Sequence, residues 1–137
     1  MSKPTKIADC MHAKPLTVSA GANLAEAAAL ILDNKLTGVT VVDGEGHMCG
    51  ILSELDCIKG VIGAIYNDGD PGHLLVSDVM TTDVNSCHPE DNIVEVAQGM
   101  LETRQRRRPV VDDNDVLVGQ VSSSNILWAL MENARDS

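Results

Sequence analysis

The chain has 137 residues, which is enough for one domain with a sizeable core and leaves no room for a separate catalytic domain beside it. A hydrophobic fraction of 44% and a charged fraction of 22% are those of an ordinary globular protein, so the composition argues against disorder. A formal net charge of −10 repels phosphate backbones, and one Trp, one Tyr and no Phe provide no platform for stacking bases, so no nucleic acid partner is expected.

The cysteines and histidines narrow the possibilities further. No two of the four cysteines have C-x-x-C spacing, and the sequence contains no secretory segment and no apolar run of membrane length. We therefore expect a cytoplasmic protein with reduced thiols and no membrane contact. The four histidines stand one by one in loop-like segments, a spacing that predicts no metal site, although side chains from different segments could converge in the fold.

Residues 1–15 are expected to form an irregular lead-in, because Pro4 and Pro15 break regular structure. A short strand over residues 16–19 follows. Asn23 is placed as the N-cap of the first long helix, which should end near Lys35, and Glu26 lies in its first turn. The apolar residues of this helix recur at i, i+4, i+7 and i+8, which predicts one buried stripe of Leu24, Ala28, Ile31 and Leu32.

A β-hairpin and a second helix come next. Residues 38–43 and 47–52 have the composition of strands and are joined by the turn signal Gly44-Glu45-Gly46. A helix begins at Ser53, and we expect its apolar residues to face inward, namely Leu55, Ile58, Val61, Ile62 and Ile65. Residues 67–75 are expected to be a linker, because they begin with Asn67-Asp68-Gly69-Asp70-Pro71-Gly72.

After the linker the sequence repeats. Residues 8–59 align with residues 77–128 without a gap, at an offset of 69, and 11 of the 52 pairs are identical. Asn92 and Glu95 repeat the helix cap, and the hairpin and the closing helix recur over residues 109–134. We predict an α/β (α+β) fold of two β-α-β-β-α units, residues 1–66 and 76–137, packed about a pseudo-twofold axis. Packing is expected because a unit of about 60 residues cannot bury its apolar face alone.

In each repeat a strand leads directly into a helix, through Gly50-Ile51-Leu52-Ser53-Glu54-Leu55-Asp56 and Gly119-Gln120-Val121-Ser122-Ser123-Ser124-Asn125. The free N–H groups and the positive helix dipole at such a junction can bind a phosphate or a sugar hydroxyl. The spacing also suits a capping box, in which the serine and the residue three positions later satisfy the helix's own N–H groups. Capping is the better interpretation of one junction alone, and the repetition favours binding.

The doubled pattern resembles a tandem pair of cystathionine-β-synthase (CBS) domains, a regulatory module, over nearly the whole chain. The resemblance rests on the two junctions and on four further segments: Asp9-Cys10-Met11, Asp78-Val79-Met80, Val41-Val42-Asp43 and Pro109-Val110-Val111-Asp112. It implies binding of an adenosyl ligand such as AMP, ADP, ATP, S-adenosylmethionine or a dinucleotide in clefts between the two copies.

The resemblance also assigns roles to individual residues. In the family the junction Ser or Thr meets phosphate and the Asp takes the ribose hydroxyls, which here implies Ser53 and Asp56 in the first copy. The second copy has Ser122, but Asn125 replaces the Asp, and a neutral carboxamide accepts a hydrogen bond more weakly than a carboxylate. Backbone and apolar side chains that hold adenine in the family correspond to Thr17, Val18, Val39 and Thr40, and to Ser86, Cys87, Arg108 and Pro109.

Four of the ten basic residues lie together as Arg104, Arg106, Arg107 and Arg108. Arginines near a helix C-terminus favour its dipole and stay solvated, which is the preferred interpretation for Arg104 and Arg106. Arg107 and Arg108 lie beside the ligand cleft that the resemblance implies, and there phosphate binding is an equal alternative, because a guanidinium matches phosphate oxygens. Such a ligand would be polyphosphorylated. Arg108 also departs from the apolar residue that the family usually has before this proline.

No nucleophile and base form a catalytic arrangement, so we do not expect an enzyme. Ser122, Ser123 and Ser124 are better explained by capping, and the aspartates at 112, 113 and 115, which could hold Mg²⁺, by turn chemistry. We expect a stand-alone sensor of adenine nucleotides, with no obligatory cofactor, that acts in trans on an unknown effector protein. Family analogy implies a flat homodimer formed through the closing helices. The alternative is a dimerisation or scaffold module that binds no nucleotide.

Overall fold

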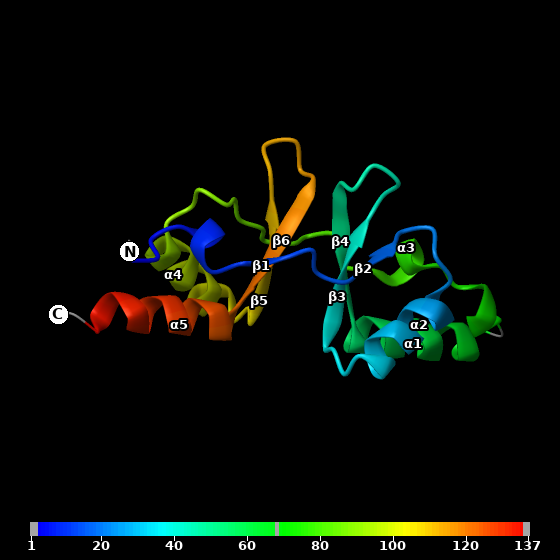
Figure 1. Cartoon of the computed structure of the whole chain (residues 1–137). Helices are drawn as coiled ribbons and strands as arrows, with labels where there is room; N and C mark the ends of the chain where they lie inside the picture. The colour runs from blue at the N-terminus through cyan, green and yellow to red at the C-terminus, as the bar shows by residue number, and fades with distance from the viewer. Residues whose placement is uncertain (1–2, 68, 136–137) are drawn as a thin grey trace. The chain divides into compact units, whose positions relative to one another are not determined.

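The computed structural model describes residues 3–67 and 69–135 and has the mixed α/β fold expected from the repeat (Figure 1). Its contacts divide the chain into two compact units. The first-repeat unit comprises residues 16–84, and the second-repeat unit comprises residues 3–15 together with 85–135.

The first-repeat unit has a three-stranded sheet in the order β2-β3-β4. β2 (Thr17–Ser19) pairs in parallel with β3 (Gly38–Val42), and β3 pairs antiparallel with β4 (Met48–Ser53). Between β2 and β3 lies α1 (Leu24–Asp33), and α2 (Glu54–Tyr66) follows β4 directly. Asn23 caps α1 as predicted, since its Oδ1 accepts the Ala25 N–H at 2.8 Å. The helix ends at Asp33, and Lys35 then has a left-handed φ of 53°.

The second-repeat unit has the sheet order β1-β6-β5, made of β1 (His12–Ala13), β6 (Leu117–Ser122) and β5 (Arg107–Val111). Its helices are α4 (Ile93–Thr103) and α5 (Ser123–Ala134). Asn92 caps α4 by accepting the N–H groups of Val94 and Glu95 at 2.8 and 3.2 Å, as predicted. The first strand of this repeat is reduced to one parallel bridge between Cys87 and Val110, which corresponds to the Val18–Val41 pair of the other unit.

The lead-in of each repeat pairs with the other repeat. In β1, His12 pairs with Gln120 of β6, and at the equivalent place Thr81 pairs with Ile51 of β4. The short helix η1 (Ile7–Asp9) therefore belongs to the second-repeat unit, whereas η2 (Pro71–His73) and α3 (Val76–Val79) belong to the first. The predicted boundaries 1–66 and 76–137 follow the sequence repeat. The compact units differ from them because the lead-in of each repeat belongs to the unit of the other repeat. In the linker predicted at 67–75, Asp68 lies outside the described residues.

This exchange explains the glycine that begins each junction motif. A Cβ added at Gly50 would lie 2.5 Å from the carbonyl oxygen of Thr81, far inside a normal contact. At Gly119 it would lie 2.8 Å from the Met11 sulfur and 3.0 Å from the His12 carbonyl oxygen. Both positions therefore need glycine because a lead-in strand crosses at close range.

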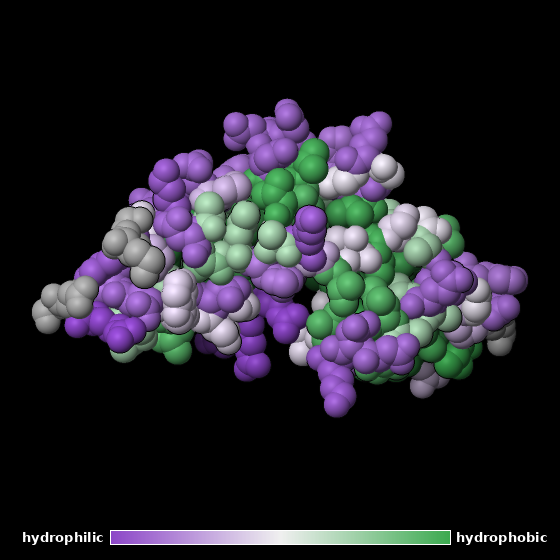
Figure 2. Space-filling view, viewed as in Figure 1, coloured by the Kyte–Doolittle hydropathy of each residue, from purple (hydrophilic) through white to green (hydrophobic). Residues whose placement is uncertain are grey.

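Each unit has its own core, but the helix faces were only partly predicted. Leu24 and Ile31 of α1 are buried as expected, and their equivalents in α4, Ile93 and Met100, are buried as well. In the α2 stripe only Val61 packs against the core as predicted. The inward assignment is wrong for the other four residues, which are largely exposed: Leu55 75%, Ile58 53%, Ile62 47% and Ile65 60%. Leu32 and Leu101 are likewise exposed, at 67% and 79%. Helical periodicity identifies an apolar face but not what covers it. Figure 2 shows apolar side chains at the surface, among polar ones, in the region of α1 and α2.

Candidate functional site

The junction between β4 and α2 forms a complete capping box. Ser53 Oγ accepts the Asp56 N–H at 3.0 Å, and Asp56 Oδ2 accepts the Ser53 N–H at 3.0 Å. The second junction repeats this arrangement, with Ser122 Oγ accepting the Asn125 N–H at 3.2 Å and Asn125 Oδ1 accepting the Ser122 N–H at 3.0 Å. The capping interpretation is therefore confirmed at both junctions. Any ligand role has to use what the caps leave free.

Asp56 keeps acceptor capacity after capping its helix. A carboxylate has about four acceptor positions. Among the described residues, Asp56 receives besides the cap only the Thr81 hydroxyl, at 3.2 Å to Oδ1 and 3.3 Å to Oδ2. The side chain is half-buried. The first-repeat unit thus presents a partly free carboxylate, held on both sides, at the N-terminus of α2. Thr81 was not predicted as a site residue, because only the exchange of lead-ins brings it there.

Asn125 presents different chemistry at the equivalent place. Its single side-chain oxygen accepts the Ser122 N–H, so it keeps one lone pair, and the amide NH₂ adds two donors. Asn125 therefore has less acceptor capacity than Asp56 and no charge, and it can also donate.

The four residues assigned to adenine lie where β2 and β3 begin. Thr17 is the register partner of Thr40, and Gly38 of β3 is the partner of Ser53, so these residues lie toward the same end of the three strands. Val18 and Val39 belong to the core cluster, on the opposite face from Thr17 and Thr40. Their side chains are therefore occupied in packing, and only their backbone groups remain for a ligand.

A pocket of about 430 Å³ lies beside Asp56 within the first-repeat unit. The residues that line it include two carboxylates, one ammonium group and one hydroxyl: Asp56, Asp78, Lys59 and Thr81. Lys59 was also missed by the sequence reasoning. Its position six residues after Ser53 places it on the same helix as Asp56. The other side of the pocket is formed by residues of the segment 74–81, the lead-in of the second repeat, and the sequence did not predict that contact.

The two arginines assigned to phosphate lie on opposite faces of β5. Arg107 is the cross-strand partner of Ser122 and so shares its face. Arg108 pairs with the buried Val121, and its guanidinium lies against Gly99 of α4. Strand alternation therefore separates two neighbours that the sequence grouped together. Ser86 lies next to the Cys87 bridge, and Pro109 is the register partner of Gln120.

The thiols and the acidic turn show no metal-binding arrangement. All four cysteines are free, and burial raises the pKa of the Cys87 thiol to about 12, although the positive charge of Arg108 acts in the opposite direction. Asp112 Oδ1 accepts the N–H groups of Asn114 and Val116 at 2.8 and 3.0 Å, which confirms turn chemistry there. Among residues 3–67 and 69–135, no group of three or more His, Cys, Asp or Glu side chains is placed to hold a metal ion.

The CBS domain family matches the chain twice, at residues 7–63 and 76–132. The chain therefore belongs to the CBS domain family and carries a tandem pair of its domains. The CBS domain-containing protein YhcV of Bacillus subtilis is 30% identical over 129 residues, covering 94% of this chain and 88% of that protein. The homoserine O-acetyltransferase of Methanococcoides burtonii is 30% identical over 122 residues, which are 89% of this chain and only 23% of the enzyme.

Solved structures share the fold over almost the full length. CBSX2 of Arabidopsis thaliana, in complex with AMP, has a TM-score of 0.82 at 24% identity and covers 96% of this chain and 100% of its own. The CBS domain pair of MJ0100, in complex with 5′-methylthioadenosine and S-adenosyl-L-methionine, has a TM-score of 0.73 at 25% identity and covers 92% and 99%. CBS pairs similar to this chain thus bind adenosyl compounds.

Proposed function

We propose that this tandem CBS pair is a regulatory module whose first-repeat unit binds an adenosyl ligand such as AMP, ADP, ATP or S-adenosylmethionine. The observation that carries the proposal is the spare acceptor capacity of Asp56 at the N-terminus of α2. A charged acceptor held beside a helix N-terminus suits the two ends of a nucleotide. Ribose hydroxyls donate to the carboxylate, and the positive end of the helix dipole attracts phosphate. The adenosyl ligands of the MJ0100 pair support this choice.

The proposal gives each residue of the first-repeat unit a role. Asp56 accepts from the ribose hydroxyls, and Ser53 lies at the phosphate end. Thr17 and Thr40, with the backbone of Val18 and Val39, receive the adenine. In the second-repeat unit, Ser122, Asn125 and Arg107 form the weaker counterpart, because Asn125 has one uncharged acceptor oxygen where Asp56 has a carboxylate.

Asp56→Asn is the sharpest test, because Asn125 shows that an asparagine completes the same capping box. The variant should fold normally and lose at least about tenfold in affinity for the adenosyl ligand, the loss of one charge-assisted hydrogen bond. The measurement is the thermal unfolding midpoint with AMP, ADP, ATP, S-adenosylmethionine and NAD, with GTP as the non-adenine reference. Asp33→Asn, an exposed residue at the end of α1, controls for the change of charge. Equal midpoint shifts in wild type and Asp56→Asn would refute the site.

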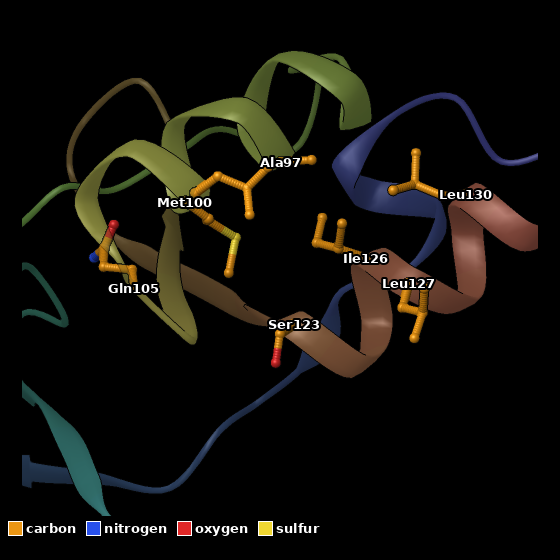
Figure 3. Close-up of a pocket in the computed structure, with 8 residues that line it drawn as sticks. Ala97, Met100, Gln105, Ser123, Ile126, Leu127 and Leu130 are labelled. Atoms are coloured by element: carbon orange, nitrogen blue, oxygen red, sulfur yellow. The ribbon is translucent and has the colours of Figure 1, made fainter.

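A homodimer is the second part of the proposal. The groove between α1 and α2 (about 170 Å³) and the groove between α4 and α5 (about 220 Å³) are lined by equivalent residues. Figure 3 shows Met100 and Ile126 at the α4/α5 groove. Exposed Ile58 and Leu127 border the two grooves at equivalent positions. A second copy would cover these faces, so sedimentation should show a dimer at micromolar concentration, and Ile58→Glu should shift it to monomer.

Regulation of an effector protein in trans and a cytoplasmic location remain part of the proposal. None of the helices in the described ranges is long and apolar enough to span a membrane.

A nucleotide-independent dimerisation module is the alternative function, and the replacement of the aspartate by Asn125 in the second repeat favours it. It predicts a dimer whose unfolding midpoint is unaffected by every adenine ligand.

A further inference from the structure

Four equivalent positions are apolar in the first-repeat unit and are occupied by glycine or polar residues in the second. In the first-repeat unit Leu16, Leu30, Leu36 and Val39 occupy them, and Leu30, Leu36 and Val39 pack in or against the core. At an offset of 69, the second-repeat unit has Asn85, Gly99, Gln105 and Arg108. Four apolar residues are thus replaced by a small residue and three polar ones, which then contact one another.

The replacements form a network around Arg108. This residue is only 8% exposed, and its Nε donates to Gln105 Oε1 at 3.0 Å. Gln105 is held in turn by the Thr103 hydroxyl at 3.1 Å and by its own Nε2, which donates to the Asn85 carbonyl at 3.3 Å. Gly99 makes room for the charge, since a Cβ there would lie 3.1 and 3.2 Å from the two Nη atoms.

The guanidinium has no counter-charge in the described part of the chain. No carboxylate lies within 4 Å of Arg108 there, nor of Arg104, Arg106 or Arg107, in a chain with 20 acidic residues. Its two Nη atoms donate to no described residue, including the carbonyls at the end of α4. Since no fully buried side-chain nitrogen or oxygen lacks a partner among those residues, each Nη atom keeps some access to solvent, although the residue as a whole is buried. A guanidinium stays charged, and a charge this buried is costly without a partner.

We propose that Arg108 is an oxyanion site that binds a phosphate group of a small molecule. The four N–H groups on Nη1 and Nη2 form a fork that matches two phosphate oxygens, while Gln105 and Gly99 fix its orientation. Phosphate is favoured over carboxylate because the chain supplies many carboxylates and places none here. The site goes beyond the proposed adenosyl site: it lies in the other unit and on the opposite face of β5 from Arg107 and Ser122.

The test uses inorganic pyrophosphate as the probe, at an ionic strength matched with sodium chloride. The triple variant Gly99→Leu, Gln105→Leu, Arg108→Val carries the residues that the first-repeat unit has at these positions, so it should retain a packed fold. We expect pyrophosphate to raise the unfolding midpoint of the wild type, and the triple variant to bind it at least about tenfold more weakly. Gly99→Ala should weaken binding several-fold without any change of charge, because the new Cβ displaces the guanidinium.

Arg106→Ala is the matched control, since it removes an exposed arginine of the same run and should change the affinity less than about twofold. Equal pyrophosphate affinities in wild type and triple variant, or no midpoint shift in the wild type, would overturn the site.

ATP and adenosine distinguish a nucleotide phosphate from a free phosphate. If the triple variant loses affinity for ATP but not for adenosine, the phosphate bound at Arg108 belongs to a nucleotide. Asp56→Asn should leave pyrophosphate binding intact, so failure of the adenosyl proposal is seen separately.

Discussion

In the first-repeat unit, Asp56 caps α2 with one carboxylate oxygen, and from the described residues its other oxygen receives only the Thr81 hydroxyl. In the second-repeat unit, Asn125 has a single side-chain oxygen and uses it in the cap. The units share their helix caps, hairpins and glycine crossings at one offset. Only two of the ten basic residues, Lys35 and Lys59, lie within residues 16–84, and the other eight lie in the rest of the chain. One scaffold thus keeps its packing in both repeats while its polar groups change from a carboxylate to a neutral amide and a run of arginines.

The largest expected effect tests which unit each lead-in stabilises. Ile7 of η1 and Val76 of α3 are equivalent and fully buried, in the cores of the second-repeat and first-repeat units respectively. Ile7→Ala should cost about 4 kcal/mol and Val76→Ala about 2 to 3 kcal/mol, from lost burial and the cavity left behind. Hydrogen exchange should show lost protection in α4 and α5 for Ile7→Ala and in α1 and β3 for Val76→Ala. Loss confined to α1 and β3 in Ile7→Ala would contradict the exchange of lead-ins.

The glycine crossings should differ between the units. Gly50→Ala places a Cβ 2.5 Å from a backbone carbonyl oxygen, which can retreat only if the lead-in moves, and should cost about 3 kcal/mol. Gly119→Ala first meets the flexible Met11 side chain, at 2.8 Å, and should cost about 1 to 2 kcal/mol. Midpoints of urea unfolding measure both. A larger loss in Gly119→Ala would show that the second crossing is the more rigid one.

Much of this fold follows from local sequence. The caps at Asn23 and Asn92, the hairpins and the gapless repeat were predictable because each depends on neighbouring residues. The outward face of α2 was not, since an apolar stripe looks the same whether a core or a partner covers it. The exchange of lead-ins was not predictable either, because residues 6–13 carry no local signal for the repeat with which they pair.

The site was predictable to a similar extent. The Ser53 and Asp56 spacing predicts both a cap and a binding position, and the geometry shows the cap and leaves acceptor capacity free. The contact of Thr81 with Asp56 depends on the exchange and has no sequence signature. The separation of Arg107 from Arg108 follows from strand alternation, once both are assigned to β5.

A smaller effect distinguishes Cys87 from its counterpart Val18 at alkaline pH. Folding keeps the Cys87 thiol neutral by raising its pKa from 9.0 to about 12. The stability it contributes is complete below pH 9 and is lost as the pH rises from 9 towards 12, because only the unfolded chain ionises there. At pH 10 the loss is about 1.4 kcal/mol relative to pH 7. Cys87→Val should remove this part of the pH dependence, while that of Cys10, Cys49 and Cys57, whose pKa values burial also raises, remains. Denaturant unfolding at the two pH values measures the difference. Cys49→Ala, at a half-buried thiol, is the control and should preserve most of the dependence.

The smallest expected effect concerns Thr81, the residue that joins the exchange of lead-ins to the candidate site. Thr81→Val removes the hydroxyl that donates to Asp56 but leaves both hydrogen bonds of the capping box, so the stability should fall by only about 0.5 to 1 kcal/mol. Affinity for AMP should fall about threefold, because the carboxylate is no longer held on its second side. His12→Ala alters the equivalent position of the second-repeat unit and should leave AMP affinity unchanged in titration calorimetry. If His12→Ala weakens AMP binding as much as Thr81→Val, the ligand does not distinguish the two units, and the contrast between Asp56 and Asn125 does not determine where it binds.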